Sequence, residues 1–201
     1  PLMNYKAFMV PGMLVLLLTM VGSNLTAINI VKEKEIGTIE QINVTPVRKF
    51  DFIMSKLIPF WVLGLVVFTV GFLISRFFYG IVPVGSIATV YVFAAVYLLA
   101  VLGLGLLIST YANNQQQAML ISFFLMMLFV LMSGLYTSID SMPEWAKNVT
   151  KANPVTYFIR VMRMVVLKGS GFADIKYELL TIAGFAVALN GWAVLNYHKR
   201  S

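Results

Sequence analysis

Long uninterrupted apolar runs constrain this chain more than any other feature of its sequence. A helix needs about 20 mainly apolar residues to cross roughly 30 Å of hydrocarbon. The runs do not alternate polar and apolar residues, as the strands of a membrane barrel do over about 10 positions. We therefore predict an all-α membrane protein with five transmembrane helices, at about residues 7–30, 57–78, 86–111, 118–139 and 178–197.

Composition supports the same interpretation. The chain is 60% hydrophobic and 11% charged, whereas soluble domains carry about 25% charged residues. It has no cysteine, so disulfides, thiol catalysis and cysteine-ligated metals are excluded. The net charge of +7 comes from loops and helix ends, where lipid headgroups rather than nucleic acid supply the counter-charge. We predict a single transmembrane domain over residues 1–201, and we interpret the start at Pro1 as the loss of an N-terminal part.

Ionisable residues are missing from the interior of the five runs. Proton relays and ion-coupled carriers normally need such residues within the membrane. The sequence also lacks the phosphate-binding GxxxxGK[ST] loop and an HExxH metal motif. We therefore predict that the chain is not an enzyme, has no catalytic, cofactor or metal site, and must take any energy for transport from another protein.

Polar uncharged residues do occur inside the predicted spans, and they allow two interpretations. The first is hydrogen bonding between helices, which applies to residues such as Thr19, Thr69 and Asn190. The second is a polar translocation path along the first span, because four polar residues gather toward one of its ends. The residues of this possible path are Ser23, Asn24, Thr26 and Asn29.

Two intervals between the spans carry most of the polar residues. In the first, at residues 31–50, Ile36, Ile39 and Ile42 recur every third position and Thr45-Pro46 ends the pattern, which predicts a short amphipathic helix at the membrane surface. The second, at residues 138–176, mixes charged and apolar residues in a way that is typical of interfacial or re-entrant helices. Counting Lys and Arg does not decide the orientation, because the two sides carry seven and eight.

The residues from Glu33 to Pro46 read EKEIGTIEQINVTP. This run resembles the cytoplasmic coupling segment of ABC-2 type exporter permeases, an acidic E-x-x-x-G-T-x-E-x-[LI] pattern that ends at Thr-Pro or Ser-Pro. A second resemblance comes later in the chain, before the family's last helix. It rests on the stretch from Met142 to Trp145, on Asn153-Pro154, and on Arg160, Arg163 and Gly169.

This resemblance implies that the five runs are helices two to six of a six-helix permease. The family's first helix and the large extracytoplasmic region after it are absent here. The resemblance also implies a multi-pass protein of the inner membrane, with the coupling segment and the C-terminus in the cytoplasm and residues 138–176 outside. The residues that would couple to the ATPase are Glu33, Glu35, Gly37, Thr38, Glu40 and Pro46.

The partners that the resemblance implies are an ABC ATPase subunit, a second permease copy or paralogue, and membrane lipid. The leading hypothesis is the permease subunit of an ATP-driven exporter of amphipathic, drug-like or lipid-like molecules. One alternative is a non-transporting membrane scaffold or assembly protein. A secondary transporter is less favoured, because the sequence has neither an evident internal repeat nor paired ionisable residues in the spans.

Overall fold

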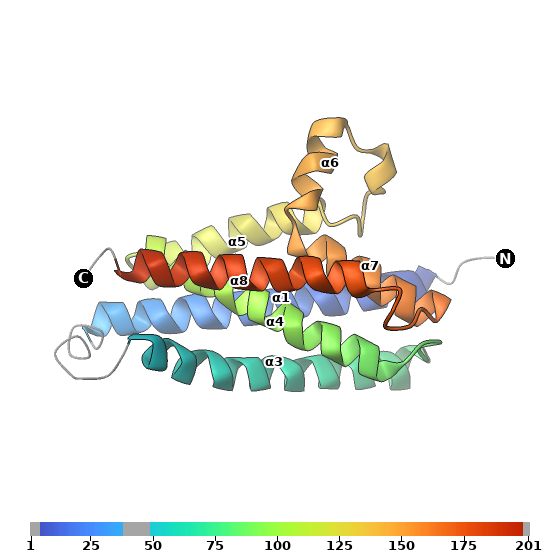
Figure 1. Cartoon of the computed structure of the whole chain (residues 1–201), viewed down its shortest axis with the longest axis horizontal. Coiled ribbons are helices and arrows are strands. Elements are labelled where there is room, and N and C mark those ends of the chain that lie inside the picture. The colour runs from blue at the N-terminus through green and yellow to red at the C-terminus, as the bar shows by residue number, and fades with distance from the viewer. Residues whose placement is uncertain (1–4, 38–48, 199–201) are drawn as a thin grey trace.

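The computed structural model describes residues 5–37 and 49–198, and these residues form helices and no strand. The bundle is elongated, with the beginning of α1 at one end and the last turn of α8 at the other (Figure 1). The elements are α1 (Tyr5–Ile36), α3 (Lys49–Tyr79), α4 (Ile87–Tyr111), α5 (Gln115–Leu131), the 3-10 helix η1 (Ile139–Ser141), α6 (Glu144–Lys151), α7 (Pro154–Lys168) and α8 (Lys176–His198).

The all-α prediction is confirmed for the described residues, and each of the five apolar runs contains a helix. Among the described residues, four helices are long and apolar enough to cross a membrane, within Phe8–Ile36, Phe50–Tyr79, Ile87–Tyr111 and Lys176–Asn196. The third and last runs match their predicted limits closely. The predicted count of five spans is not confirmed, because the fourth run forms a shorter helix.

That shorter helix, α5, has 17 residues and ends at Leu131, eight residues before the predicted limit. At 1.5 Å per residue it covers roughly 26 Å, less than the hydrocarbon core of a bilayer. The chain turns soon after its end, where Gly134 has a φ of 78°. Hydrophobicity continues past this glycine, so the apolar run alone overstated the length of the helix.

The first two helices are longer than predicted, at the expense of the polar interval between them. Helix α1 continues through the charged residues 32–35 to Ile36, and α3 already begins at Lys49. Lys and Glu are good helix formers, so a helix that starts in an apolar run can extend through them. Gly37, with a φ of 80°, follows the end of α1. The rest of the predicted coupling helix, residues 38–48, lies outside the described residues.

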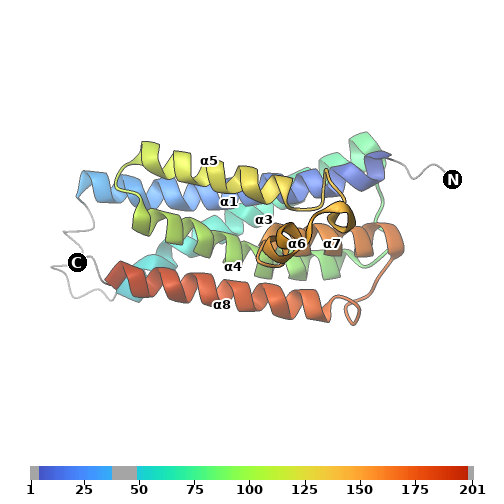
Figure 2. The ribbon, with the colours of Figure 1, turned by 90° about the horizontal axis from the view of Figure 1, so that it is seen from above.

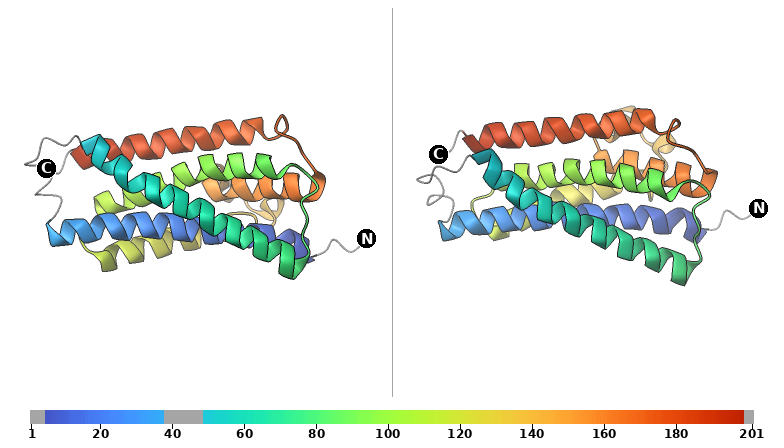
Figure 3. Two further views of the ribbon diagram at one scale, coloured as in Figure 1. Left: turned by 90° about the horizontal axis from the view of Figure 1, so that it is seen from below. Right: turned by 60° about the horizontal axis from the view of Figure 1, so that its bottom comes forward.

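Helix α4 is the centre of the bundle. It packs against α1, α3, α7 and α8, and most of its residues are buried. Viewed from above, α4 lies between α1 and α8, and α5 lies at the edge beyond α1 (Figure 2). Helix α3 crosses one face of this layer diagonally, from the C-terminal end of α8 toward the N-terminal end of α1 (Figure 3).

Polar side chains connect the helices, as the first interpretation of these residues predicts. The hydroxyls of Thr19 and Tyr97 are 2.5 Å apart between α1 and α4. Tyr91 donates to Thr69 at 2.9 Å, between α4 and α3. Asn190 donates from α8 to the Leu99 carbonyl of α4 at 2.9 Å. These bonds satisfy polar groups that lipid could not satisfy.

Candidate functional site

The last turn of α1 forms a junction with three other helices. Glu33 makes an ion pair with Lys56 of α3. Lys34 donates to the carbonyl of Ser109 near the end of α4, and to that of Ala112 just after it. Glu35 accepts hydrogen bonds from Gln115 at the start of α5. We call these three consecutive residues, Glu33, Lys34 and Glu35, the α1 junction.

Glu35 acts as an external cap for α5. Its carboxylate accepts from the backbone N–H of Gln115 at 3.0 Å and from the Gln115 side chain at 2.5 Å. Within α5, Asn114 is the N-cap and accepts from the backbone N–H of Gln117 at 2.7 Å. A helix begins with unpaired N–H groups and a partial positive charge, and a carboxylate stabilises both. The orientation of α1 is thereby linked to the start of α5.

The interactions of Glu33 and Glu35 in the α1 junction differ in their exposure to solvent. In the Glu33–Lys56 pair, the side chains are 17% and 33% exposed. The bonds of Glu35 to Gln115 are exposed. Because burial reduces screening by water and salt, the Glu33–Lys56 pair is the stronger electrostatic link of the two.

The predicted ATPase-coupling residues are only partly described. Glu33, Glu35 and Gly37 lie at the end of α1, whereas Thr38, Glu40 and Pro46 lie outside the described residues. Ile36 is 65% exposed, so it does not pack against the bundle. The two described carboxylates contact the chain's own helices. We did not predict the roles of Lys34, Lys56 and Gln115 from the sequence. The alternating charges of residues 32–35 could have indicated ion pairs and hydrogen bonds to neighbouring helices.

The four residues of the predicted translocation path do not line one surface. Ser23 and Thr26 are fully buried, and both lie beside Gly105 on the α4 side of α1. Asn29 is partly buried, and its Oδ1 has no hydrogen-bond partner among the described residues. Asn24 lies on a different face. It follows Leu17 and Met20, both exposed, by seven and four residues, which places it on their outward-facing stripe.

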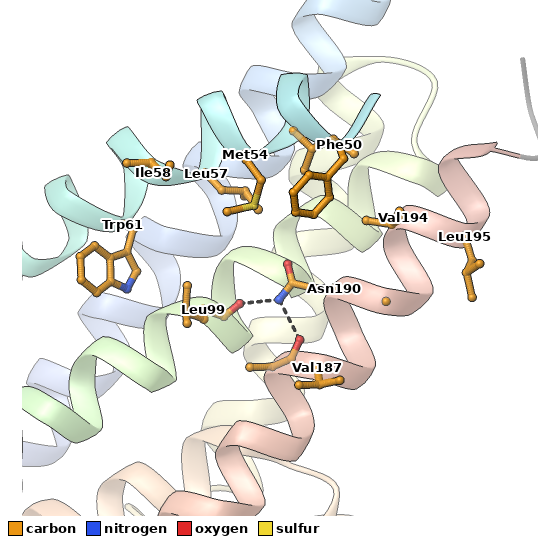
Figure 4. A pocket seen from close by; sticks show the side chains of 13 residues that line it. Phe50, Met54, Leu57, Ile58, Trp61, Leu99, Val187, Asn190, Val194 and Leu195 are labelled. Carbon is orange, nitrogen blue, oxygen red and sulfur yellow. Dashed lines mark hydrogen bonds between the residues drawn. The ribbon is translucent and has the colours of Figure 1, made fainter. Parts of the chain in front are cut away.

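A cavity of about 790 Å³ lies between α3 and α8, over α4 (Figure 4). The side-chain N–H groups of its two most polar wall residues already donate to backbone carbonyls: Trp61 donates to that of Ala95, and Asn190 to those of Leu99 and Ala186. The cavity therefore presents an apolar surface. This cavity could not be predicted from the sequence, because its shape depends on the diagonal course of α3. Its lining residues are Phe50, Ile53, Met54, Leu57, Ile58, Trp61, Leu99, Ala186, Val187, Asn190, Gly191, Val194 and Leu195.

Helix α7 is built from the second sequence motif. Asn153 is its N-cap and accepts from the backbone N–H of Val155 at 3.0 Å, while its Nδ2 donates to the Phe129 carbonyl of α5. Pro154 occupies the first turn, where its missing N–H costs nothing. Gly169 ends the helix with a φ of 71°. One face of α7 is buried against α1 and α4, so this helix packs into the bundle.

Arg163 of α7 is the most enclosed cation of this region. Its guanidinium lies 3.8 Å from the ring centroid of Phe8 in α1. Its Nη2 donates to the Gly134 carbonyl at 3.2 Å. Partial burial lowers the pKa of the Arg163 guanidinium from its ordinary value. Since an arginine pKa is ordinarily above 12, the group keeps its charge at neutral pH.

The described residues contain no group of three or more His, Asp or Glu side chains that could hold a metal ion.

Residues 1–195 match the family described as ABC-2 family transporter protein. The chain is also similar to several permeases, and it spans about half the length of the three that are described below.

The first of these relatives is the probable multidrug ABC transporter permease YbhR of Escherichia coli K12, which is 32% identical over 200 residues, 100% of this chain and 54% of YbhR. The second is the probable multidrug ABC transporter permease YbhS of the same organism, 30% identical over 194 residues, 96% of this chain and 52% of YbhS. The third is the inner membrane transport permease YhhJ of Escherichia coli K12, which is 27% identical over 186 residues, 90% of this chain and 49% of YhhJ.

Proposed function

Because this chain belongs to the ABC-2 transporter family, we propose that it is the membrane-spanning part of an ATP-driven exporter permease. ATP would be hydrolysed by a separate ABC ATPase subunit, because the chain carries no phosphate-binding loop motif. Its lack of ionisable residues inside the apolar runs fits a transporter that draws no energy from an ion gradient.

The observation that carries this proposal is the α1 junction. It lies where α1 ends, at the beginning of the segment from Glu33 to Pro46 that resembles a coupling segment. Its three side chains contact α3, the end of α4 and the start of α5. A rigid-body displacement of the segment after Gly37 would therefore be passed to four helices at once. Packed helices respond to such a displacement by tilting or shifting as units.

We place the junction end of the bundle in the cytoplasm and the α6–α7 end outside, in a multi-pass arrangement in the inner membrane. Helix α5 presents a highly exposed apolar face, on which Leu120, Phe123 and Phe124 are 72%, 67% and 61% exposed. Such a face needs either lipid or another apolar protein surface as its neighbour. We propose that a second permease copy or a paralogue and membrane lipid share it.

We propose an amphipathic, drug-like or lipid-like substrate. The names of the relatives YbhR and YbhS include multidrug transport. The apolar cavity between α3 and α8 has a volume of about 790 Å³, within the range of sites for molecules of drug size. Several of its wall residues, such as Val187 and Leu195, are exposed on the surface of the bundle. A membrane-dissolved compound could therefore reach it from the lipid side.

The proposed function is tested by co-purification. The tagged native gene product is expressed together with the ABC ATPase genes next to it and purified in mild detergent. We expect an ATPase to be recovered with the permease, and its rate of ATP hydrolysis in lipid nanodiscs to differ from that of the ATPase alone. If no ATPase is recovered under these conditions, the exporter proposal fails and a membrane scaffold becomes the better description.

A charge exchange tests the role of the α1 junction. Glu33→Lys places two lysines together in a partly buried position, and we expect it to reduce the permease-dependent ATP hydrolysis by about tenfold, equivalent to about 1.4 kcal/mol. Combining it with Lys56→Glu restores an ion pair of opposite polarity and should restore most of the activity. Asp51→Lys, an exposed change of equal charge at the same end, is the control. If the double variant is as impaired as Glu33→Lys, then Glu33 acts on the partner and not through Lys56.

The position of Asn24 leads to a second functional prediction. We propose that the outward-facing stripe of α1 lines the translocation path and that Asn24 offers the substrate a hydrogen bond there. Asn24→Leu should then reduce the efflux of an amphipathic dye about three- to tenfold, the loss expected for one hydrogen bond. Ser23→Ala, a change on the buried face, should leave efflux unchanged. The opposite ranking of the two variants would place the path on the α4 side of α1.

A further inference from the structure

A second cavity lies beside α7, at the end of the bundle away from the α1 junction. It has a volume of about 340 Å³ and is bounded by α1, α7 and the segment between α5 and α6. Arg160, Arg163 and Lys168 are among its lining residues, and no Asp or Glu is. Its complete described lining is Phe8, Ser133, Ile139, Thr156, Ile159, Arg160, Arg163, Met164, Leu167 and Lys168.

Arg163 is held in this cavity with one donor unused. Phe8 lies under its guanidinium and the Gly134 carbonyl accepts from Nη2, so the group cannot easily turn away. Its Nε is buried and has no hydrogen-bond acceptor among the described residues. A buried donor of a charged group without an acceptor is costly. Arg163 lines the cavity, so its guanidinium supplies positive charge there.

The surrounding charges leave the cavity positive. Among the described residues, the acidic group paired with a lining residue is Glu178 of α8, whose Oε1 is 3.9 Å from Nη1 of Arg160. That distance is too long for a hydrogen bond, and Arg160 is 51% exposed. Lys168 is exposed at the end of α7. Three cations and one distant carboxylate favour an anionic ligand, and arginine suits the oxygens of a phosphate in particular.

The cavity also lies at a suitable depth for a lipid headgroup. The C-terminal end of α7 is fixed to the turn between α3 and α4, where Gly85 donates to the Val165 carbonyl at 3.0 Å. Arg163 lies five residues before the last residue of α7, a rise of about 7.5 Å. The polar headgroup region of a bilayer extends about 5–7 Å beyond the hydrocarbon on each side. We place the C-terminal end of α7 at the outer edge of the headgroup region, which would put the guanidinium close to the boundary between headgroups and hydrocarbon.

We propose that this cavity is a binding site for a phosphate group, with the Arg163 guanidinium as its most enclosed cation and with Arg160 and Lys168 supplying further charge. The phosphate could belong to a phospholipid of the adjacent leaflet or to a free phosphate compound in the water outside. Bound there, it would tie α1, α7 and the segment after α5 together. This inference needs only a membrane-embedded chain, so it stands or falls separately from the proposed function.

The test uses the purified 201-residue chain in a mild neutral detergent and measures its thermal stability during titration with four probes. The probes are dioctanoyl phosphatidylglycerol, dioctanoylglycerol, which lacks the phosphate, glycerol 3-phosphate and inorganic phosphate. Ligands that bind only the folded protein raise its stability in proportion to the logarithm of their concentration over Kd. We expect the phosphatidylglycerol to stabilise the chain and dioctanoylglycerol to have little effect.

The variants assign the effect to the cavity. Arg163→Gln should weaken phosphatidylglycerol binding about 10- to 100-fold, the loss of a charge-assisted hydrogen bond. Arg163→Lys keeps a cation near Phe8 but removes Nε, and should weaken binding about tenfold. Lys168→Gln should cost about two- to fivefold. Lys151→Gln, which removes an exposed charge of α6 outside the cavity, is the matched control and should bind as the parent does.

The outcomes distinguish the source of the phosphate. If glycerol 3-phosphate or inorganic phosphate binds as tightly as the lipid and depends equally on Arg163, the site takes free phosphate compounds. If only phosphatidylglycerol binds, the site takes a lipid headgroup. Equal binding by Arg163→Gln, Arg163→Lys and the parent would overturn the proposal, as would equal stabilisation by dioctanoylglycerol. Because Arg163→Lys and Lys168→Gln keep the packing around Phe8, they serve as readouts if Arg163→Gln does not fold.

Discussion

Gly105→Ala is expected to lower the free energy of unfolding by about 3 kcal/mol. A Cβ at this position of α4 would lie 2.5 Å from the carbonyl oxygen of Ser23 and 2.8 Å from Cβ of Thr26, both in α1. Neither atom is the end of a flexible side chain, so the two helices would have to separate. Small residues let membrane helices approach closely, and dispersion contacts along such an interface are lost together when it opens.

The loss can be measured by unfolding the protein in mixed micelles with increasing amounts of a denaturing detergent. Gly184→Ala is the matched control, because it makes the same change in α8 at a position where a Cβ would meet nothing within 4 Å. It should leave stability unchanged or raise it slightly, since alanine favours helix more than glycine does. Equal stability of the two variants would mean that α1 and α4 are not held as closely as the structure shows.

Phe158→Ala should have a similarly large effect, because Phe158 fastens α7 to the bundle. Its ring centroid lies 4.7 Å from that of Tyr97, 5.2 Å from that of Phe93 and 5.9 Å from that of Phe68, in α4 and α3. Removing a fully buried phenyl group from a soluble core costs 3 to 5 kcal/mol. Lipid tails are as apolar as a protein core, so we expect the lower end, about 3 kcal/mol, as lost packing.

Phe123→Ala is the control for Phe158→Ala. Phe123 is 67% exposed on the outer face of α5, so its removal leaves no cavity. We expect a change of less than about 0.5 kcal/mol, as for substitutions away from packed features. Hydrogen exchange should also show faster exchange in α7 of Phe158→Ala than in α7 of the parent, since that helix loses its central contact. If both variants unfold at the same detergent concentration, α7 is not anchored by this ring.

The sequence predicted the presence of the long helices better than their ends. The apolar runs identify α1, α3, α4 and α8 because hydrophobicity is a property that each segment carries by itself. The end of α5 depends on backbone geometry at Gly134, where the run remains apolar. Helix α1 continues through residues 32–35, whereas their charges led us to place them in a separate polar interval with its own short helix.

The candidate sites were less predictable than the helices. The first motif begins in the α1 junction and continues into residues outside the described ranges, and the second supplies the caps of α7. The polar residues of the first span were grouped by their closeness in sequence, yet Ser23 and Asn24 are adjacent residues on different faces of one helix. Neither cavity is visible in the sequence, because each is lined by residues from separate helices.

By itself, the sequence determined that this chain is a membrane protein of long helices and which family it resembles. These properties follow from the hydrophobicity of continuous segments and from short motifs, and both are local. Only the tertiary structure decided how far α1 and α5 extend, which residues form the α1 junction, and that α7 enters the bundle with Arg163 in a positive cavity. Those features depend on contacts between helices that are far apart in the chain. Such a contact cannot be deduced from the sequence of either helix by itself.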